Sequence, residues 1–188
     1  GTRVVFGRAD DSHRSRRLQP EPRTGTRRHS ARTRRPPARH VAERPLTTMS
    51  NIRRGVWTNW AGNQRANPQS WVKPRNLGEI AAVVGEAIAQ GRKVKVIGSG
   101  HSFTGAAVAQ GVLVDLSHMC RVVSGPNEDG VVEVEAGITL SALNEYLFKQ
   151  GRALQNLGDI SYQTVSGAIS TGTHGTGVHI GGLAQQVV

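Results

Sequence analysis

A short apolar strand that runs directly into a glycine-rich turn is the feature that most constrains the fold of this chain. The strand is predicted over Lys93–Ile97, and Gly98-Ser-Gly-His-Ser102 follows it at once. Two glycines around one serine let the backbone turn tightly and bring its N–H groups close to a ligand, usually an anion. The turn therefore predicts a site for a phosphate-bearing cofactor, with the imidazole of His101 held beside it on rigid backbone.

A second block, Gly158–Gly177, is crowded with glycines, serines and threonines. Small side chains over such a length would leave a core underfilled unless something large lies against the backbone. Within the block, Thr164–Ile169 is compatible with a helix, and hydroxyls and free N–H groups at a helix end suit a diphosphate. We therefore expect the two blocks to face each other across a groove that holds one ligand.

Strand and helix patterns around these blocks predict an α+β domain. Asn76 is a candidate N-cap with Glu79 as its capping-box partner, and an apolar stripe continues from Leu77 to Ile88 before Gly91 ends the helix. Because this helix lies between strands at 70–74 and 93–97, it predicts a βαβ unit. Further strands are expected over 111–116, 131–137, 154–157 and 183–188, with a second helix after Thr139.

Several side chains outside the glycine-rich blocks are predicted to have structural roles. Glu133 and Glu135 alternate with valines, which predicts a pair of solvated carboxylates on one strand face. Cys120 is the sole cysteine, so an internal disulfide is excluded, and free cysteine is usually found at or near the core. His118 and His179 are expected to be surface or packing residues. No histidine pair has metal-ligand spacing beside a carboxylate, so no metal site is predicted.

The positive charge is concentrated at the N-terminal end. Residues 1–48 hold 13 arginines and no lysine against 4 acidic residues, and so carry nine of the eleven net positive charges. This composition predicts a disordered tail. The interpretations are a segment upstream of a natural start at Met49, an organellar transit peptide, a nucleic-acid-binding arm and a solvated tail. The exclusive use of arginine favours the first.

Other sequence classes are excluded by missing patterns. No apolar run approaches the roughly 18 residues of a transmembrane helix, and no signal-peptide pattern is present. The Rossmann fingerprint requires a third glycine three residues after Gly100, but this chain has Phe103 there. No P-loop motif occurs either. A cytoplasmic location is expected, with peripheral membrane association as the alternative.

Taken together, the blocks resemble the FAD-binding (PCMH-type) domain of the vanillyl-alcohol oxidase / p-cresol methylhydroxylase superfamily. The resemblance covers about residues 55–188 and rests on four segments in the expected order: Val94–Thr104, Leu113–Leu116, Val132–Gly137 and Gly158–Gly177. Within the superfamily, the chain is most similar to the sugar-1,4-lactone oxidases and dehydrogenases, the gulonolactone and arabinonolactone oxidases. Asn59-Trp60 followed by Trp71-Val-Lys-Pro74 also resembles the opening of those proteins. The resemblance implies two small α/β subdomains within residues 49–188, with FAD between them.

The resemblance also implies which residues contact FAD. Backbone N–H groups of the first turn would wrap the diphosphate: Gly98, Ser99, Gly100, His101 and Ser102. The second block would line the other side of the cofactor with Asp159, Ser166, Gly167, Thr171, Gly172, Thr173 and Gly175. In relatives with this turn the histidine is often bonded to the 8α-methyl of the isoalloxazine, which makes His101 the candidate for a covalent linkage. His174 either contacts the flavin or packs.

The implied function is the FAD-binding part of an oxidoreductase that oxidises a sugar-1,4-lactone by hydride transfer to FAD, with oxygen or another electron acceptor. The alternatives are an alditol (xylitol-type) oxidase and a non-catalytic basic fragment that binds nucleic acid, against which the near-neutral domain argues. No counterpart of the family's substrate-binding domain is visible before Val188. We therefore expect a domain truncated at its C-terminus, with no catalytic residue of its own and no activity as an isolated fragment.

Overall fold

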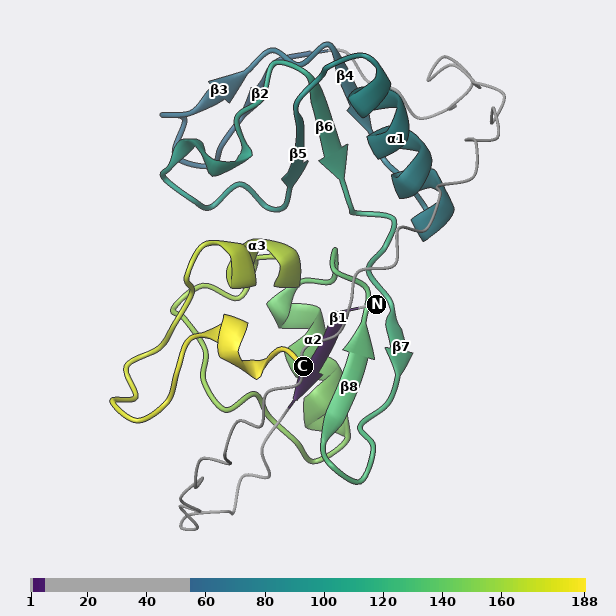
Figure 1. Ribbon diagram of the computed structural model, residues 1–188. Coiled ribbons are helices and arrows are strands. Elements are labelled where there is room, and N and C mark those ends of the chain that lie inside the picture. Colours follow the sequence, from purple (N-terminus) through teal and green to yellow (C-terminus); the bar gives the residue numbers. More distant parts are fainter. Residues whose placement is uncertain (1, 6–54) are drawn as a thin grey trace, which may run out of the picture.

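The computed structural model describes residues 2–5 and 55–188, and their helices and strands form two lobes, one stacked on the other (Figure 1). The N-terminal lobe holds the elements from β2 to β6, and the C-terminal lobe holds β1 and the elements from β7 onward. The two lobes correspond to the two small α/β subdomains that the resemblance implied. Among residues 2–5 and 55–188, no helix is long and apolar enough to cross a membrane.

The N-terminal lobe is built on a parallel sheet of three strands in the order β4 (Ser70–Val72), β6 (Val112–Asp115) and β5 (Val94–Ile97). The predicted βαβ connection is present, but β6 lies between its two strands. β6 takes the centre because Val112, Leu113 and Val114 are all buried, and central parallel strands are apolar on both faces. A short hairpin of β2 (Trp57–Thr58) and β3 (Arg65–Ala66) and a 3₁₀ turn, η2 (Gly105–Ala107), complete the lobe.

Helix α1 (Leu77–Ala89) begins at the predicted cap. The Asn76 Oδ1 atom accepts from the Glu79 backbone N–H at 2.9 Å, while the Glu79 carboxylate accepts from the Arg75 N–H at 2.8 Å. The buried face agrees with the predicted stripe only in part: Ala87 is buried as predicted, but Val83, outside the stripe, is also buried, and the stripe's ends, Leu77 and Ile88, are exposed. Nearly every residue of α1 is apolar or small, so spacing alone does not identify the face that packs.

The C-terminal lobe combines an antiparallel sheet with helices that cover it (Figure 1). Its strands lie in the order β1 (Thr2–Val5), β8 (Val131–Val134) and β7 (Val122–Ser124). The helices are α2 (Leu140–Lys149), capped as predicted by Thr139, α3 (Val165–Ser170), and the 3₁₀ helix η3 (Leu183–Gln186). Their buried side chains share one core: Val132, Val134, Ile138, Leu140, Leu143, Leu147, Leu154, Val165, Ala168 and Leu183.

Three segments differ from their predicted secondary structure. Thr2–Val5, inside the segment predicted to be disordered, pairs with the edge of β8, where unpaired backbone groups accept an extended segment. Residues 6–48 and Met49 lie outside the described residues. The structure therefore does not test the interpretations of the arginine-rich tail or of a natural start at Met49. No strand forms over 154–157, and residues 183–186 form η3 rather than a strand, with the Gln185 N–H donating to the Gly182 carbonyl at 3.0 Å.

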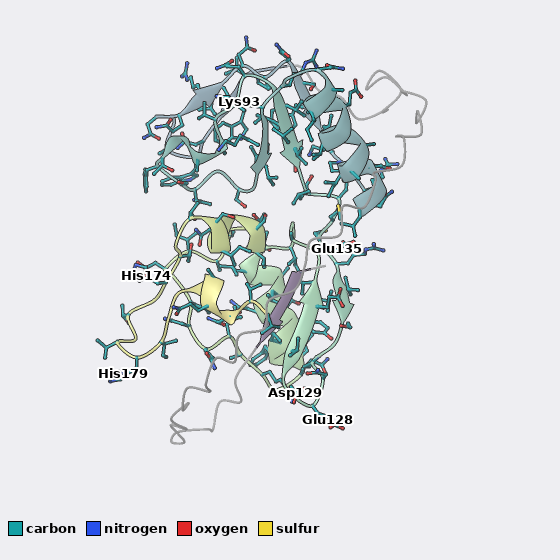
Figure 2. The ribbon with its side chains drawn as sticks, viewed as in Figure 1. Lys93, Glu128, Asp129, Glu135, His174 and His179 are labelled. Atoms are coloured by element: carbon teal, nitrogen blue, oxygen red, sulfur yellow. The ribbon has the colours of Figure 1, made fainter. Side chains whose placement is uncertain are left out.

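Two of the predicted side-chain roles are wrong. Glu135 is not solvated: it is 8% exposed, lies between the lobes in Figure 2, and accepts from the Arg121 guanidinium at 2.8 Å. These hydrogen bonds from Arg121 lower the pKa of Glu135. The alternation of half-buried and buried side chains ends with β8 at Val134, so it does not predict the burial of Glu135. Cys120 is exposed because it lies on the connection from β6 to β7 and not in a strand.

Candidate functional site

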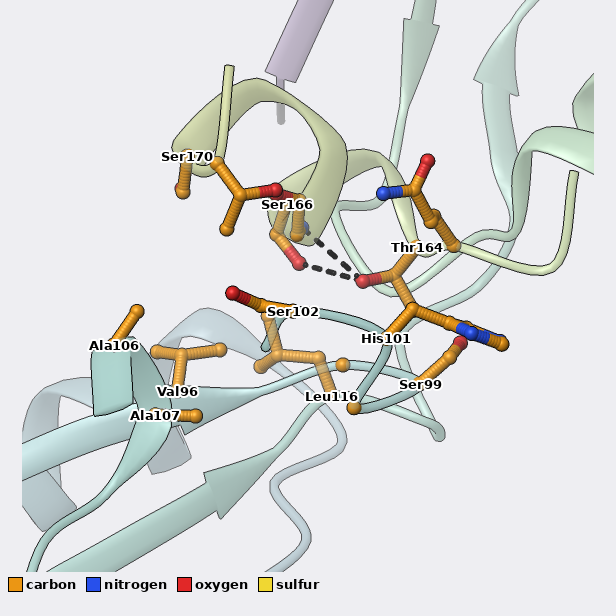
Figure 3. Close-up of a pocket in the computed structure, with 15 residues that line it drawn as sticks. Val96, Ser99, His101, Ser102, Ala106, Ala107, Leu116, Thr164, Ser166 and Ser170 are labelled. Carbon is orange, nitrogen blue, oxygen red and sulfur yellow. Dashed lines mark hydrogen bonds between the residues drawn. The ribbon is translucent and has the colours of Figure 1, made fainter. Parts of the chain in front are cut away.

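A cavity of about 330 Å³ lies between the lobes and is walled by both glycine-rich blocks (Figure 3). One wall is the loop Gly98–Ser102, called here the glycine loop, together with residues of the N-terminal lobe. The opposite wall is α3 with the residues just before and after it. The prediction that the two blocks face each other across a groove is therefore confirmed. The lining residues are Val96, Gly98, Ser99, Gly100, His101, Ser102, Ala106, Ala107, Leu116, Gln163, Thr164, Ser166, Gly167, Ser170 and Thr171.

The cavity brings together eight of the twelve predicted cofactor-binding residues: Gly98, Ser99, Gly100, His101, Ser102, Ser166, Gly167 and Thr171. The other four, Asp159, Gly172, Thr173 and Gly175, do not line it. Thr173 contacts a residue that does line the cavity: its hydroxyl accepts a hydrogen bond from the Gln163 side chain at 3.0 Å. Gln163, Thr164 and Ser170 line the cavity but were not predicted, although they belong to the same small-residue block.

The glycine loop leaves its N–H groups available. The backbone N–H groups of Ser99, Gly100, His101 and Ser102 donate to no group in the described part of the chain. Gly100 has φ +71°, a conformation that suits glycine. Gly98 lies so close to Thr164 that a Cβ atom there would overlap the threonine hydroxyl. A run of unpaired donors beside a cavity is the geometry expected of an anion-binding loop.

The start of α3 does not supply further free donors, contrary to the sequence interpretation. The Val165 N–H donates to the Ile138 carbonyl at 2.8 Å, and the Ser166 N–H donates to the Ala136 carbonyl at 3.0 Å. The Gly167 N–H donates to the Thr164 hydroxyl, the N-cap of this helix, at 3.2 Å. The backbone donors at the cavity therefore come from the glycine loop, while α3 contributes hydroxyls (Figure 3).

His101 is placed on the glycine loop with one ring atom unused. Its Nδ1 atom is buried and has no hydrogen-bond partner among the described residues. The ring lies against Trp60, with centroids 5.5 Å apart. Of the two nearby tryptophans, Trp57 is buried and Trp60 is 68% exposed. His174 and His179 lie at the left-hand edge of the molecule in Figure 2, and neither lines the cavity.

A second cavity of about 500 Å³ adjoins the first. The two share the lining residues Gly98, Ser99, Leu116 and Thr164. The second continues along the lobe junction past Asp115 and Cys120 to the start of α2. Together they make an extended site, suited to a ligand longer than one ring system.

Asp115, at the end of β6, is held in its charged form beside this second cavity. Its carboxylate is 2.7 Å from the Lys73 ammonium and accepts from the Ser117 N–H at 2.9 Å. Burial on its own would raise the pKa of Asp115, but hydrogen bonds from Lys73 and Ser117 outweigh it, so the pKa is lowered. The carboxylate therefore stays ionised and fixes the ends of β4 and β6 together.

Lys73→Met is expected to remove most of the pH dependence that Asp115 gives to stability. Because the pKa of Asp115 in the fold lies below its ordinary value of 3.8, its contribution is complete above that value. The contribution is lost as the pH falls through the lower folded-state value. Urea unfolding at about pH 7 and about pH 3 measures this difference in both proteins. An unchanged difference in the Lys73→Met protein would contradict the assignment.

The residues at the cavity fit a flavin dinucleotide. Four backbone donors that have no partner among the described residues suit the diphosphate, and two adjoining cavities suit an extended molecule. The small side chains of α3 leave its surface open on the cavity side. The buried His101 Nδ1 atom has no hydrogen-bond partner among the described residues, so it is free to contact a cofactor.

Comparison with known proteins identifies the fold and family. Residues 68–188 match the FAD binding domain family. The L-gulono-1,4-lactone dehydrogenase of Mycobacterium tuberculosis is 39% identical over 133 residues, which cover 71% of this chain and 31% of that protein. The D-arabinono-1,4-lactone oxidase of Kluyveromyces lactis is 39% identical over 137 residues, which cover 71% of this chain and 26% of that protein. A solved structure of a solvent-stable cholesterol oxidase superposes with a TM-score of 0.59 and 26% identity, over 68% of this chain and 25% of that chain.

The chain thus spans less than a third of the length of the two curated relatives. The resemblance inferred from the glycine-rich blocks is confirmed, because the matched segment contains both of them. Since that segment covers well over half of its length, the chain belongs to the FAD binding domain family.

Proposed function

We propose that this chain is the FAD-binding part of a flavin-dependent oxidoreductase that oxidises a sugar-1,4-lactone of the gulono- or arabinono- type. The observation that carries the proposal is the meeting of the two glycine-rich blocks at one cavity, with four backbone donors on its wall that bond to no other described residue. The substrate class rests on the two relatives, which are named for L-gulono-1,4-lactone and D-arabinono-1,4-lactone. One relative is named a dehydrogenase and the other an oxidase, so oxygen or another acceptor takes the electrons.

In this proposal the chain holds and orients the cofactor. Bound FAD supplies the hydride acceptor for oxidation of a carbon–oxygen centre. The N–H groups of Ser99 to Ser102 would hold the diphosphate, compensating its negative charge with fixed dipoles. The hydroxyls of Thr164 and Ser166, 3.2 Å apart, present further polar groups from the opposite wall. Because these groups belong to different lobes, the ligand would be enclosed between them.

We also propose that His101 is the point of covalent attachment. Its Nδ1 atom is buried in the site without a described partner, and its loop is anchored at the end of a sheet strand. A covalent bond prevents loss of the cofactor and an imidazole substituent raises the flavin potential, which suits an oxidase. The predicted contacts of Asp159, Gly172, Thr173 and Gly175 with FAD stay proposals, although these residues do not line the cavity.

The test is to express the complete protein from its own gene and to measure flavin reduction with L-gulono-1,4-lactone, D-arabinono-1,4-lactone and xylitol. Lactone-dependent reduction is expected, and hydrogen peroxide formation identifies oxygen as the acceptor. Reduction by xylitol alone would favour the alditol oxidase, and a protein that binds no FAD would overturn the proposal. We expect the 188-residue chain alone to bind FAD without turnover. Fractionation of the cell tests the proposed cytoplasmic location against peripheral membrane association.

A further inference from the structure

The Asn59 side chain is a buried amide in the turn between β2 and β3, far from the glycine loop in sequence but in contact with it. It is 4% exposed. Its Oδ1 atom accepts from the Gln64 N–H at 2.9 Å, and its Nδ2 atom donates to the Asn63 Oδ1 atom at 2.7 Å. The same Nδ2 atom donates to the Ser102 carbonyl at 3.0 Å. One side chain therefore closes its own turn and reaches across to the glycine loop.

The turn 59–64 holds the glycine loop by its carbonyl groups. The Trp60 N–H donates to the Gly100 carbonyl at 2.9 Å, and Asn59 holds the Ser102 carbonyl. Side chains of Asn63 and Gln64 both donate to the Phe103 carbonyl, at 3.1 and 3.2 Å. Two carbonyl groups of the glycine loop, those of Gly100 and Ser102, and the Phe103 carbonyl just after it are thus engaged by the turn, while the N–H groups of Ser99 to Ser102 have no described partner.

This division matters for binding an anion. A loop that is free to rotate its peptide groups presents carbonyl oxygens as readily as N–H groups, and ordering it costs binding energy. Engaging the Gly100 and Ser102 carbonyls beforehand limits the rotation of their peptide groups and favours the N–H groups as the groups that meet a ligand. Among these contacts, that of Asn59 is the one made by a buried side chain, and no other described group donates to the Ser102 carbonyl. The Phe103 carbonyl, by contrast, keeps one donor if the other is removed.

We propose that Asn59 is a positioning residue for FAD: by holding the Ser102 carbonyl it keeps the N–H groups of the glycine loop arranged for the diphosphate. The inference rests on the proposed function, since it concerns the same site. Asn59 itself does not line the cavity, so its effect on the cofactor passes through the loop.

The experiment titrates FAD into FAD-free chains that carry His101→Ala, so that no covalent bond obscures a reversible affinity. Asn59→Ala is expected to weaken FAD binding by about tenfold or more, because the carbonyl of Ser102 loses its donor. Asn59→Asp keeps an acceptor for the Gln64 N–H but cannot donate to Ser102 when ionised, and should show a similar loss. This second variant separates the contact with the loop from closure of the turn, and it answers the question if Asn59→Ala does not fold.

A matched control separates positioning from stability. Asn127 closes the turn between β7 and β8 by accepting from the Val131 N–H at 2.8 Å, beside Glu128 and Asp129 at the far end of the C-terminal lobe (Figure 2). Asn127→Ala should lower the melting temperature yet change FAD affinity less than about twofold.

The outcomes distinguish this inference from the proposed function. If both Asn59 variants bind FAD as tightly as their parent, Asn59 is not a positioning residue. The same conclusion follows if Asn127→Ala weakens binding equally for an equal loss in melting temperature. If the unmodified chain binds no FAD at all, the proposed function fails, and the inference fails with it.

Discussion

Acid-precipitated protein is expected to stay yellow, and His101→Ala is expected to release all of its flavin into the supernatant. Acid unfolds the chain and so removes every non-covalent contact, while a bond from the imidazole survives. The structure supplies a suitable atom, the buried His101 Nδ1, on the wall of the cavity that both glycine-rich blocks share. Flavin absorbance of the pellet and of the supernatant measures the two fractions.

His174→Ala is the matched control for this result. His174 lies in the second glycine-rich block but is exposed and outside the cavity. Its Nδ1 atom is hydrogen-bonded to the adjacent Gly175 carbonyl at 2.9 Å. This variant is expected to keep its flavin in the pellet. Retention by His101→Ala would assign the bond to another residue, and release from the unmodified protein would mean that FAD is held without a covalent bond.

Gly98→Ala is expected to lower the free energy of unfolding by about 1–3 kcal/mol, the usual cost of overpacking a close contact. A Cβ atom at this position would overlap the Thr164 hydroxyl from the other lobe. Thr164 cannot simply turn away, because the same hydroxyl caps α3 by accepting from the Gly167 N–H. Removing the cap in Thr164→Ala should itself cost about 1 kcal/mol.

The double variant tests whether the two lobes meet here. With the threonine hydroxyl gone, the added methyl group has room, so the combined loss should be clearly smaller than the two single losses added together. Gly85→Ala is the control, because its Cβ would meet nothing within 4 Å on the exposed side of α1. That exchange should raise stability by about 0.5–1 kcal/mol. Strict additivity in urea unfolding would show that Gly98 and Thr164 do not share a contact.

Local patterns predicted much of this fold because they act over a few residues. The caps at Asn76 and Thr139 and the turn at Gly98–Ser102 depend on neighbours in the chain, and each forms where the sequence places it. The composition of Gly158–Gly177 also carried real information: small side chains predicted a surface that lies against something large, and α3 does face a cavity.

Features decided by distant contacts were not predictable in the same way. The orientation of α1 depends on which apolar face meets the sheet, and the central place of β6 depends on its pairing with both β4 and β5, which are distant in the chain. Glu135 accepts a hydrogen bond at the lobe junction from Arg121, which lies fourteen residues earlier in the chain. The role of Asn59 requires a contact with Ser102, forty-three residues away, which no periodicity reveals.

The walls of the cavity come from opposite lobes, and this has a consequence for how the molecule unfolds. Each lobe has its own core, so without a ligand the lobes can lose structure at different denaturant concentrations. A ligand that touches both favours only the state in which both are intact, by mass action. Saturation with FAD should therefore merge two separate melting steps into a single cooperative transition.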